Sequence, residues 1–258
     1  MQPEDANTSY SVLDLFKTPR LRNITLLLTG IWMAISFVFE GHVINNSSSG
    51  WDLFSSFSIA AATELPALSI IFLLDHLGLR WLTFGSMVMS GVFSALVPTV
   101  SSKITATTLA TLGRICIKIS YNIGLQYTVE LLPTVVRAQG VAFIHIMGYV
   151  ASILAQFIVS LQHFHSSITW IVIGSIGIIG GILSLFLPET VGHKLPQTLA
   201  DGEDFGRGQG MWDFPCFSKK VDDDNEIDNE SGNFQRAQSI GQASLRASTK
   251  VSAAEADV

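Results

Sequence analysis

Polar side chains recur at helical spacing within otherwise apolar stretches of the sequence. In residues 106–129 four of them follow one another at intervals of four: Arg114, Lys118, Asn122 and Gln126. This spacing places them on one side of a helix, with Tyr121 beside them. A charge inside a bilayer costs about 2.5–3.5 kcal/mol or more and is a functional hypothesis by default. We therefore expect this side to face a partner helix or an aqueous cavity.

Residues 141–161 carry a weaker stripe at similar spacing: His145, Tyr149, Ser152 and Gln156. If the two stripes line one cavity, Lys118 sets its charge and Tyr149 supplies an aromatic wall. Glu64 lies midway along residues 53–74, followed by Pro66, which can break the helical hydrogen-bond ladder. A structural pairing of Arg114 or Lys118 with Glu64 is the alternative, and for His145 helix packing is favoured over a proton relay.

Catalytic and metal-binding patterns are weak throughout the sequence. His163 and His165 form an isolated His-x-His pair, which is poor evidence for zinc. At no single depth in the predicted membrane spans does the sequence bring together paired carboxylates, a set of metal ligands, or a nucleophile with its base. We therefore expect no enzyme activity, no metal and no cofactor, and the lack of a basic patch argues against nucleic acid as a partner.

The composition indicates a membrane protein. Of 258 residues 48% are hydrophobic and 14% are charged, whereas soluble domains carry about 25% charged residues. A bilayer-spanning helix needs about 20 mostly apolar residues, and six stretches meet this requirement: 23–39, 53–74, 81–97, 106–129, 141–161 and 168–187. The predicted fold is an all-α bundle of six transmembrane helices in the lipid bilayer.

The short loops give this bundle an orientation. One side carries Lys17, Arg20, Arg22, Arg80, Arg137 and Lys194, and the other carries Lys103 alone. The positive-inside rule then places both termini in the cytoplasm. Two overlapping glycosylation sequons, at Asn45 and Asn46, fall on the opposite side, where glycans are added.

The sequence divides into three parts: a cytoplasmic segment 1–20, the bundle 21–190 and a cytoplasmic tail 191–258. Residues 1–196 hold nine acidic and nine basic residues, and residues 197–258 hold twelve acidic and six basic ones, so the net charge of −6 lies in the tail. Because the tail is polar, acidic and rich in serine, we expect it to be largely disordered.

Several motifs carry a family resemblance. The loop with Asp75, Gly78 and Arg80 resembles the signature loop of the major facilitator superfamily, in which glycine permits a tight turn. The run from Glu130 to Gly140, with Pro133 and Arg137, is more specific. Three further motifs join it: Glu64-Leu65-Pro66-Ala67, Gly113-Arg114 and Leu187-Pro188-Glu189-Thr190. Together they resemble the organic cation/carnitine/organic anion transporter family. The residues of these motifs are most similar to those of its insect-type organic cation transporters.

The resemblance implies a multi-pass transporter, typical of the plasma membrane, that carries small organic ions. Family members have twelve spans, and this chain is similar to spans seven to twelve. Such transporters bind substrate between two six-helix halves that rock against each other. The implied partner is a missing N-terminal half, without which the chain transports nothing. The alternative is a non-transporting membrane interaction protein or a truncated product.

The resemblance also assigns cavity positions. Trp32 matches an aromatic residue of the family's cavity, and Phe39 takes the place of a second. Positions that are acidic in cation transporters are Asn122 and Tyr149 here. Trp32, Tyr121 and Tyr149 could hold a quaternary amine by cation–π contacts, whereas Lys118 opposes a cation. The charge of the substrate therefore stays open.

Overall fold

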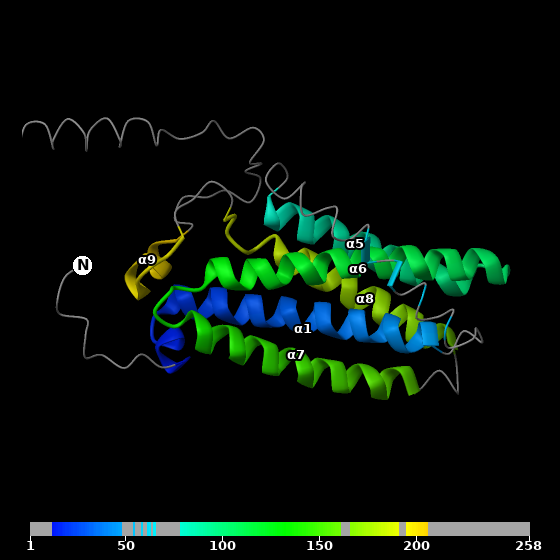
Figure 1. Cartoon of the computed structure of the whole chain (residues 1–258), viewed down its shortest axis with the longest axis horizontal. Coiled ribbons are helices and arrows are strands. Elements are labelled where there is room, and N and C mark those ends of the chain that lie inside the picture. The colour runs from blue at the N-terminus through cyan, green and yellow to red at the C-terminus, as the bar shows by residue number, and fades with distance from the viewer. Residues whose placement is uncertain are drawn as a thin grey trace, which may run out of the picture. The chain divides into compact units, whose positions relative to one another are not determined.

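The computed structural model describes residues 12–47, 54, 58, 61–62, 64–65, 78–160, 166–190 and 195–205. All of them belong to the compact unit Met1–Phe217. Every regular element in the described part is a helix (Figure 1). Five helices are long: α1 (Pro19–Ser47), α5 (Leu79–Leu96), α6 (Lys103–Leu131), α7 (Arg137–Ser160) and α8 (Ser166–Ser184). Three are short: η2 (Val12–Phe16), η4 (Val97–Thr99) and α9 (Leu199–Asp204).

Four segments are long and apolar enough to cross a membrane: Pro19–Asn45, Leu79–Thr99, Arg137–Ser160 and Ser167–Ser184. They coincide with the first, third, fifth and sixth predicted spans, and they confirm an all-helical, multi-pass membrane protein. The predicted fourth span is the 29-residue helix α6, whose charges make it less apolar than the other four. The predicted span 53–74 lies mostly outside the described residues.

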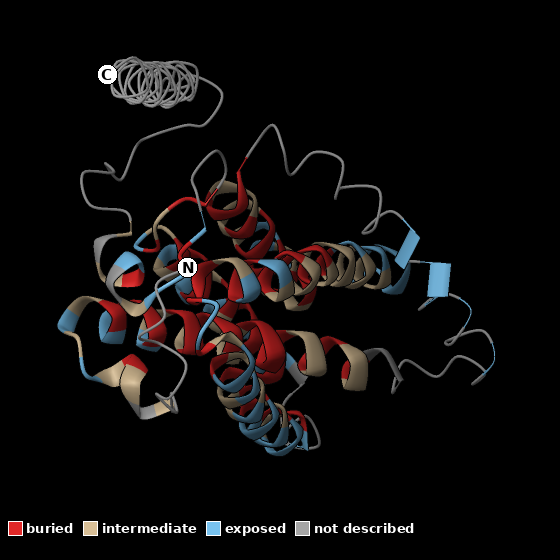
Figure 2. Cartoon of the chain, turned by 60° about the vertical axis from the view of Figure 1, so that its left-hand side comes forward, coloured by how far each residue is buried: buried red, intermediate tan, exposed pale blue. Residues whose placement is uncertain are grey.

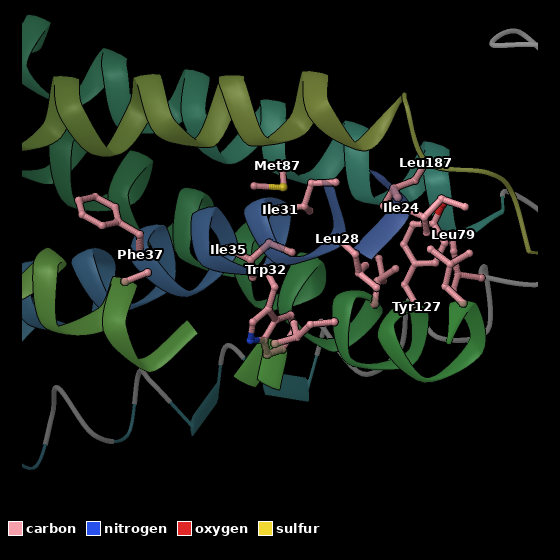
Figure 3. Close-up of a cluster of buried hydrophobic side chains, with 14 of the residues drawn as sticks. Ile24, Leu28, Ile31, Trp32, Ile35, Phe37, Leu79, Met87, Tyr127 and Leu187 are labelled. Atoms are coloured by element: carbon pink, nitrogen blue, oxygen red, sulfur yellow. The ribbon is translucent and has the colours of Figure 1, made fainter. Parts of the chain in front are cut away.

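Helix α1 is the centre of the bundle. It packs against α6, α7 and α8, whereas α5 packs against α6 and α8. Buried residues gather between the helices and exposed ones on their outward sides (Figure 2). Figure 3 shows Leu28, Trp32 and Ile35 of α1 in the buried cluster, with Met87 of α5 and Tyr127 of α6. The outward face of α7 is apolar and exposed, as a face towards lipid requires.

Helices α5 and α8 approach each other closely through glycines. A Cβ atom on Gly91 would lie 2.7 Å from the carbonyl oxygen of Gly174, and one on Gly177 would lie 3.2 Å from Cα of Gly91. Small residues allow such backbone contact, on which helix packing in membranes depends.

Helix α9 lies within the range 191–258 that the sequence assigns to a polar tail. It begins with a capping box in which Thr198 and Asp201 bond each other's backbone N–H groups. The N–H of Thr198, together with its hydroxyl, lowers the pKa of the Asp201 carboxyl. Glu203 accepts hydrogen bonds from the N–H groups of Arg20 and Leu21, at the start of α1. Residues 199–204 of the range predicted as a tail are thus helical, and Glu203 among them contacts the start of α1.

Candidate functional site

A pocket of about 360 Å³ lies where α1, α6 and α7 meet. Its lining residues are Trp32, Ser36, Phe39, Glu40, Tyr121, His145, Gly148, Tyr149, Ser152, Ile153 and Gln156. This volume is typical of pockets that take small molecules, and so is a lining that combines aromatic rings with a few polar groups.

Contiguous rings form one wall of the pocket. The ring centroids of Trp32 and Tyr121 are 5.1 Å apart, and those of Phe39 and Tyr121 are 5.0 Å apart. The imidazole of His145 continues this wall, 4.7 Å from the Trp32 ring. Trp32 is buried, whereas Tyr149 is 69% exposed at the mouth of the pocket. The rings from α1, α6 and α7 thus make one aromatic surface.

The predicted stripe on α7 lies on this pocket in full, since His145, Tyr149, Ser152 and Gln156 all line it. Gly148 lies among them because the pocket wall leaves no room for a side chain there. A Cβ atom on Gly148 would lie 2.5 Å from Nε1 of Trp32 and 2.8 Å from Oγ of Ser36. The glycine thus lets the indole of Trp32 approach α7 closely.

Lys118 satisfies parts of both interpretations of the sequence. Its Nζ lies 3.0 Å from Oε1 of Glu64, so the structural ion pair is formed. The same Nζ lies 5.3 Å from the ring centroid of Phe39 and 5.7 Å from that of Tyr121. Lys118 therefore contacts the aromatic wall while its charge is paired, and it is not itself a lining residue.

The rest of the α6 stripe does not reach the pocket. Arg114 and Asn122 are half-buried, and Nδ2 of Asn122 has no hydrogen-bond partner among the described residues. Gln126, one turn further, donates to Glu130 at 2.8 Å. The four stripe residues of α6 thus lie in different environments. An α-helix has 3.6 residues per turn, so residues spaced by four move gradually around its axis.

Glu40 also lines the pocket, although it is not among the cavity residues predicted from the sequence. The predicted first span ended at Phe39, whereas α1 continues to Ser47 and carries Glu40 within the helix. A signal existed: Trp32, Ser36 and Glu40 follow one another at intervals of four and share a helix face. Extending the helical pattern past the charge would have found this carboxylate.

The loop motifs meet at the end of the bundle where α1 and α5 begin. Gly78 precedes α5 with a φ of 78°, in the region that favours glycine, as the predicted tight turn requires. The carboxylate of Glu189 accepts hydrogen bonds from the N–H groups of Leu79 and Arg80. Arg80 is buried (2% exposed), and Asp75 lies outside the described residues.

The second loop motif, residues 130–140, also forms hydrogen bonds at this end of the bundle. Oε2 of Glu130 accepts a hydrogen bond from the Thr190 hydroxyl at 2.8 Å, and the Tyr127 hydroxyl donates to the carbonyl of Pro188. Nε of Arg137 donates to the carbonyl of Leu132 at the turn between α6 and α7. We call Glu130, Glu189 and Glu203 the carboxylate clasp, since each joins parts of the chain that lie far apart in sequence.

The sequon residue Asn45 lies in the last turns of α1. Its side chain is buried, and Nδ2 donates to the carbonyl of Gly41 at 2.9 Å. A glycan on Asn45 would need this amide to turn outward. The side chain of Asn46 lies outside the described part. No group of three His, Cys, Asp or Glu residues suited to a metal occurs among the described residues.

Comparison with curated proteins finds transporters. The chain is 30% identical over 204 residues to human "Solute carrier family 22 member 13", which covers 78% of this chain and 37% of that protein. It is 32% identical over 209 residues to "Organic cation transporter 1" of Caenorhabditis elegans, covering 80% and 36%. It is 36% identical over 197 residues to the "Beta-alanine transporter" of Drosophila melanogaster, covering 76% and 32%.

The chain spans about a third of the length of these relatives. No protein-family model matches it. The relatives are solute carriers and not enzymes, which agrees with the expectation that the chain has no enzymatic activity.

Proposed function

Since the chain belongs by this homology to solute carrier family 22, we propose that its helices form one wall of a cavity through which small organic ions cross the membrane. The observation that carries the proposal is the aromatic pocket between α1, α6 and α7. Rings with one charged group among them suit amphiphilic ions, whose apolar part stacks while the charged part is paired. One of the relatives is named an organic cation transporter and another a β-alanine transporter.

The proposal extends to the architecture of the transporter. We propose six spans with both termini in the cytoplasm of a plasma-membrane protein, followed by a largely disordered acidic tail. The chain corresponds in this proposal to one six-helix half. Alternating access needs two bundles that move against each other, so the missing N-terminal half is the required partner and this chain alone does not transport.

Binding and uptake by the purified chain test these two parts separately. In nanodiscs, we expect saturable binding of labelled organic ions, tested with tetraethylammonium, carnitine and p-aminohippurate. Trp32→Ala should abolish this binding because it removes the ring that joins Tyr121 to His145. The matched control is Trp81→Ala, a ring on α5 that does not line the pocket.

In liposomes the chain alone should show no saturable uptake of any of the three ions. Uptake at the rate of a full-length relative would refute the half-transporter proposal. A chain that binds none of the ions, or binds them equally well after Trp32→Ala, would refute the pocket as the binding wall.

A further inference from the structure

Glu40 differs from every other residue that the structure describes as lining the pocket, because it alone carries a formal charge at neutral pH. Its carboxylate is half-buried. Among the described residues, it has no salt-bridge partner and accepts no hydrogen bond. An intramembrane carboxylate is costly and needs a partner, so its position on a pocket wall indicates that the partner is a ligand.

Lys118, the cation that contacts the aromatic wall, is already paired. Lys118 forms its ion pair with Glu64 at 3.0 Å and is 19% exposed. Its ammonium also lies against the rings of Phe39 and Tyr121. The Lys118–Glu64 pair is neutral as a unit, and the charge that it presents to a solute in the pocket is small. Neither Lys118 nor Arg114 lines the pocket, so the formal charge among the described lining residues is that of Glu40.

Aromatic rings line the same pocket as this carboxylate. Trp32 and Phe39 come from the same helix, and Tyr121 bridges them from α6. Ring faces attract cations and repel anions through their quadrupole. A negative charge within an aromatic wall favours an ammonium group with attached apolar substituents, and it disfavours a carboxylate or a sulfonate.

We infer that Glu40 is the specificity-determining residue of this wall, and that its carboxylate binds the positively charged nitrogen of an amine or quaternary ammonium substrate. This inference rests on the proposed function. It reverses the sequence-based expectation in which Lys118 sets the charge of the cavity. Lys118 instead pairs with Glu64 beside the rings of Phe39 and Tyr121, and Glu40 supplies the negative charge of the pocket wall.

A thiol reporter in the pocket tests this charge directly. The full chain, with Cys116→Ala and Cys216→Ala, receives Ser152→Cys on the pocket wall. The modification rates are then measured with two methanethiosulfonate reagents, one bearing a trimethylammonium group and one bearing a sulfonate. Each rate is divided by that of the same reagent with a free thiol in solution.

We expect the cationic reagent to be favoured, and Glu40→Gln to lower the cation-to-anion rate ratio by about tenfold, since one nearby charge in water shifts the two rates in opposite directions. Glu40→Asp should keep the ratio. Asp201→Asn, which removes an equal charge on α9, is the control and should leave it unchanged. An unchanged ratio in Glu40→Gln would overturn the inference.

Protection by a ligand completes the test. Tetraethylammonium should slow the modification of Ser152→Cys, and Glu40→Gln should remove this protection. Protection that survives Glu40→Gln, or protection by p-aminohippurate in place of tetraethylammonium, overturns the inference while the pocket remains a binding site. Protection by neither ion overturns both the inference and the proposed function.

Discussion

The carboxylate clasp and the pocket both contain glutamates, but they use them differently. In the clasp, Glu189 accepts hydrogen bonds from the N–H groups of Leu79, Arg80 and Thr190, and Glu203 accepts two from the start of α1. In the pocket wall, the carboxylate of Glu40 accepts no hydrogen bond from any residue that the structure describes.

This difference separates two functions of a buried charge. A carboxylate at a helix start satisfies N–H groups that have no partner within the helix, and it interacts favourably with the helix dipole. Its interaction energy is used in holding the fold. A carboxylate in a pocket without such donors retains its capacity for an external cation. Substitutions in the clasp should therefore change stability, and substitutions in the pocket should change binding.

Glu189→Gln should have the largest effect on stability. The carboxylate is 5% exposed and bonded to three N–H groups. An amide retains one acceptor atom and no charge, so at least one donor at the start of α5 loses its partner. We expect a loss of about 2–4 kcal/mol in the free energy of unfolding. Thermal unfolding of the purified chain in detergent measures it, and a melting temperature equal to wild type would show that the clasp does not hold α5.

Gly148→Ala should act on the pocket with a smaller cost in stability. The added methyl group collides with the indole of Trp32 and with Ser36. The indole must move, at a cost of about 1–3 kcal/mol, and the contacts of Trp32 with Tyr121 and His145 change with it. We expect the binding of organic ions to fall more than tenfold, as measured by saturation with labelled ligand. Gly30→Ala is the control, since a Cβ atom there meets nothing within 4 Å; equal losses in both variants would contradict the account.

Breaking the Lys118–Glu64 pair should change the affinity for cations by a smaller factor, and the direction of the change should depend on which partner is replaced. Glu64 is 55% exposed, so this pair contributes about 0.2–1 kcal/mol. Glu64→Gln should leave an unpaired positive charge near the rings and weaken cation binding about threefold. Lys118→Gln should strengthen cation binding by a similar factor. The double variant should return to the wild-type affinity. If both single variants and the double variant lose affinity, and the loss in the double variant equals the sum of the two single losses, the pairing would be contradicted.

Asp201→Asn should have the smallest effect, confined to α9. Because hydrogen bonds from Thr198 lower the pKa of Asp201 in the folded chain, its contribution is present above the ordinary aspartate pKa. The contribution is lost as the pH falls through the lowered value. We expect a few-fold faster hydrogen exchange of the α9 amides in Asp201→Asn at pH 7. The difference from wild type should vanish in acid; a difference that persists there would assign it to another cause.

The sequence predicted the helical class because long apolar runs leave few alternatives in a bilayer. It also predicted the α7 stripe, since His145, Tyr149, Ser152 and Gln156 keep to one face over three turns. The stripe on α6 was less informative. Spacing alone does not say that Lys118 pairs with Glu64, or that Gln126 turns towards Glu130.

Long-range pairing was the part that spacing could not supply. The Glu203–α1 hydrogen bonds join residues more than 180 positions apart, and no local pattern marks them. Glu40 was missed for a different reason. The predicted first span ended just before Glu40, because a charged residue was taken to mark the end of an apolar segment. A membrane helix with a polar face towards a cavity can carry such a charge within its length.

The most direct test measures affinity and stability together in a matched pair of variants, Glu40→Gln and Glu189→Gln. Each replaces one glutamate by its amide. Binding of labelled tetraethylammonium is measured per folded molecule in nanodiscs, and the melting temperature is measured on the same preparation. The account predicts that Glu40→Gln weakens binding about tenfold without lowering the melting temperature, and that Glu189→Gln lowers the melting temperature without weakening binding. Binding that falls equally in both variants, or that is unchanged in Glu40→Gln, would contradict it.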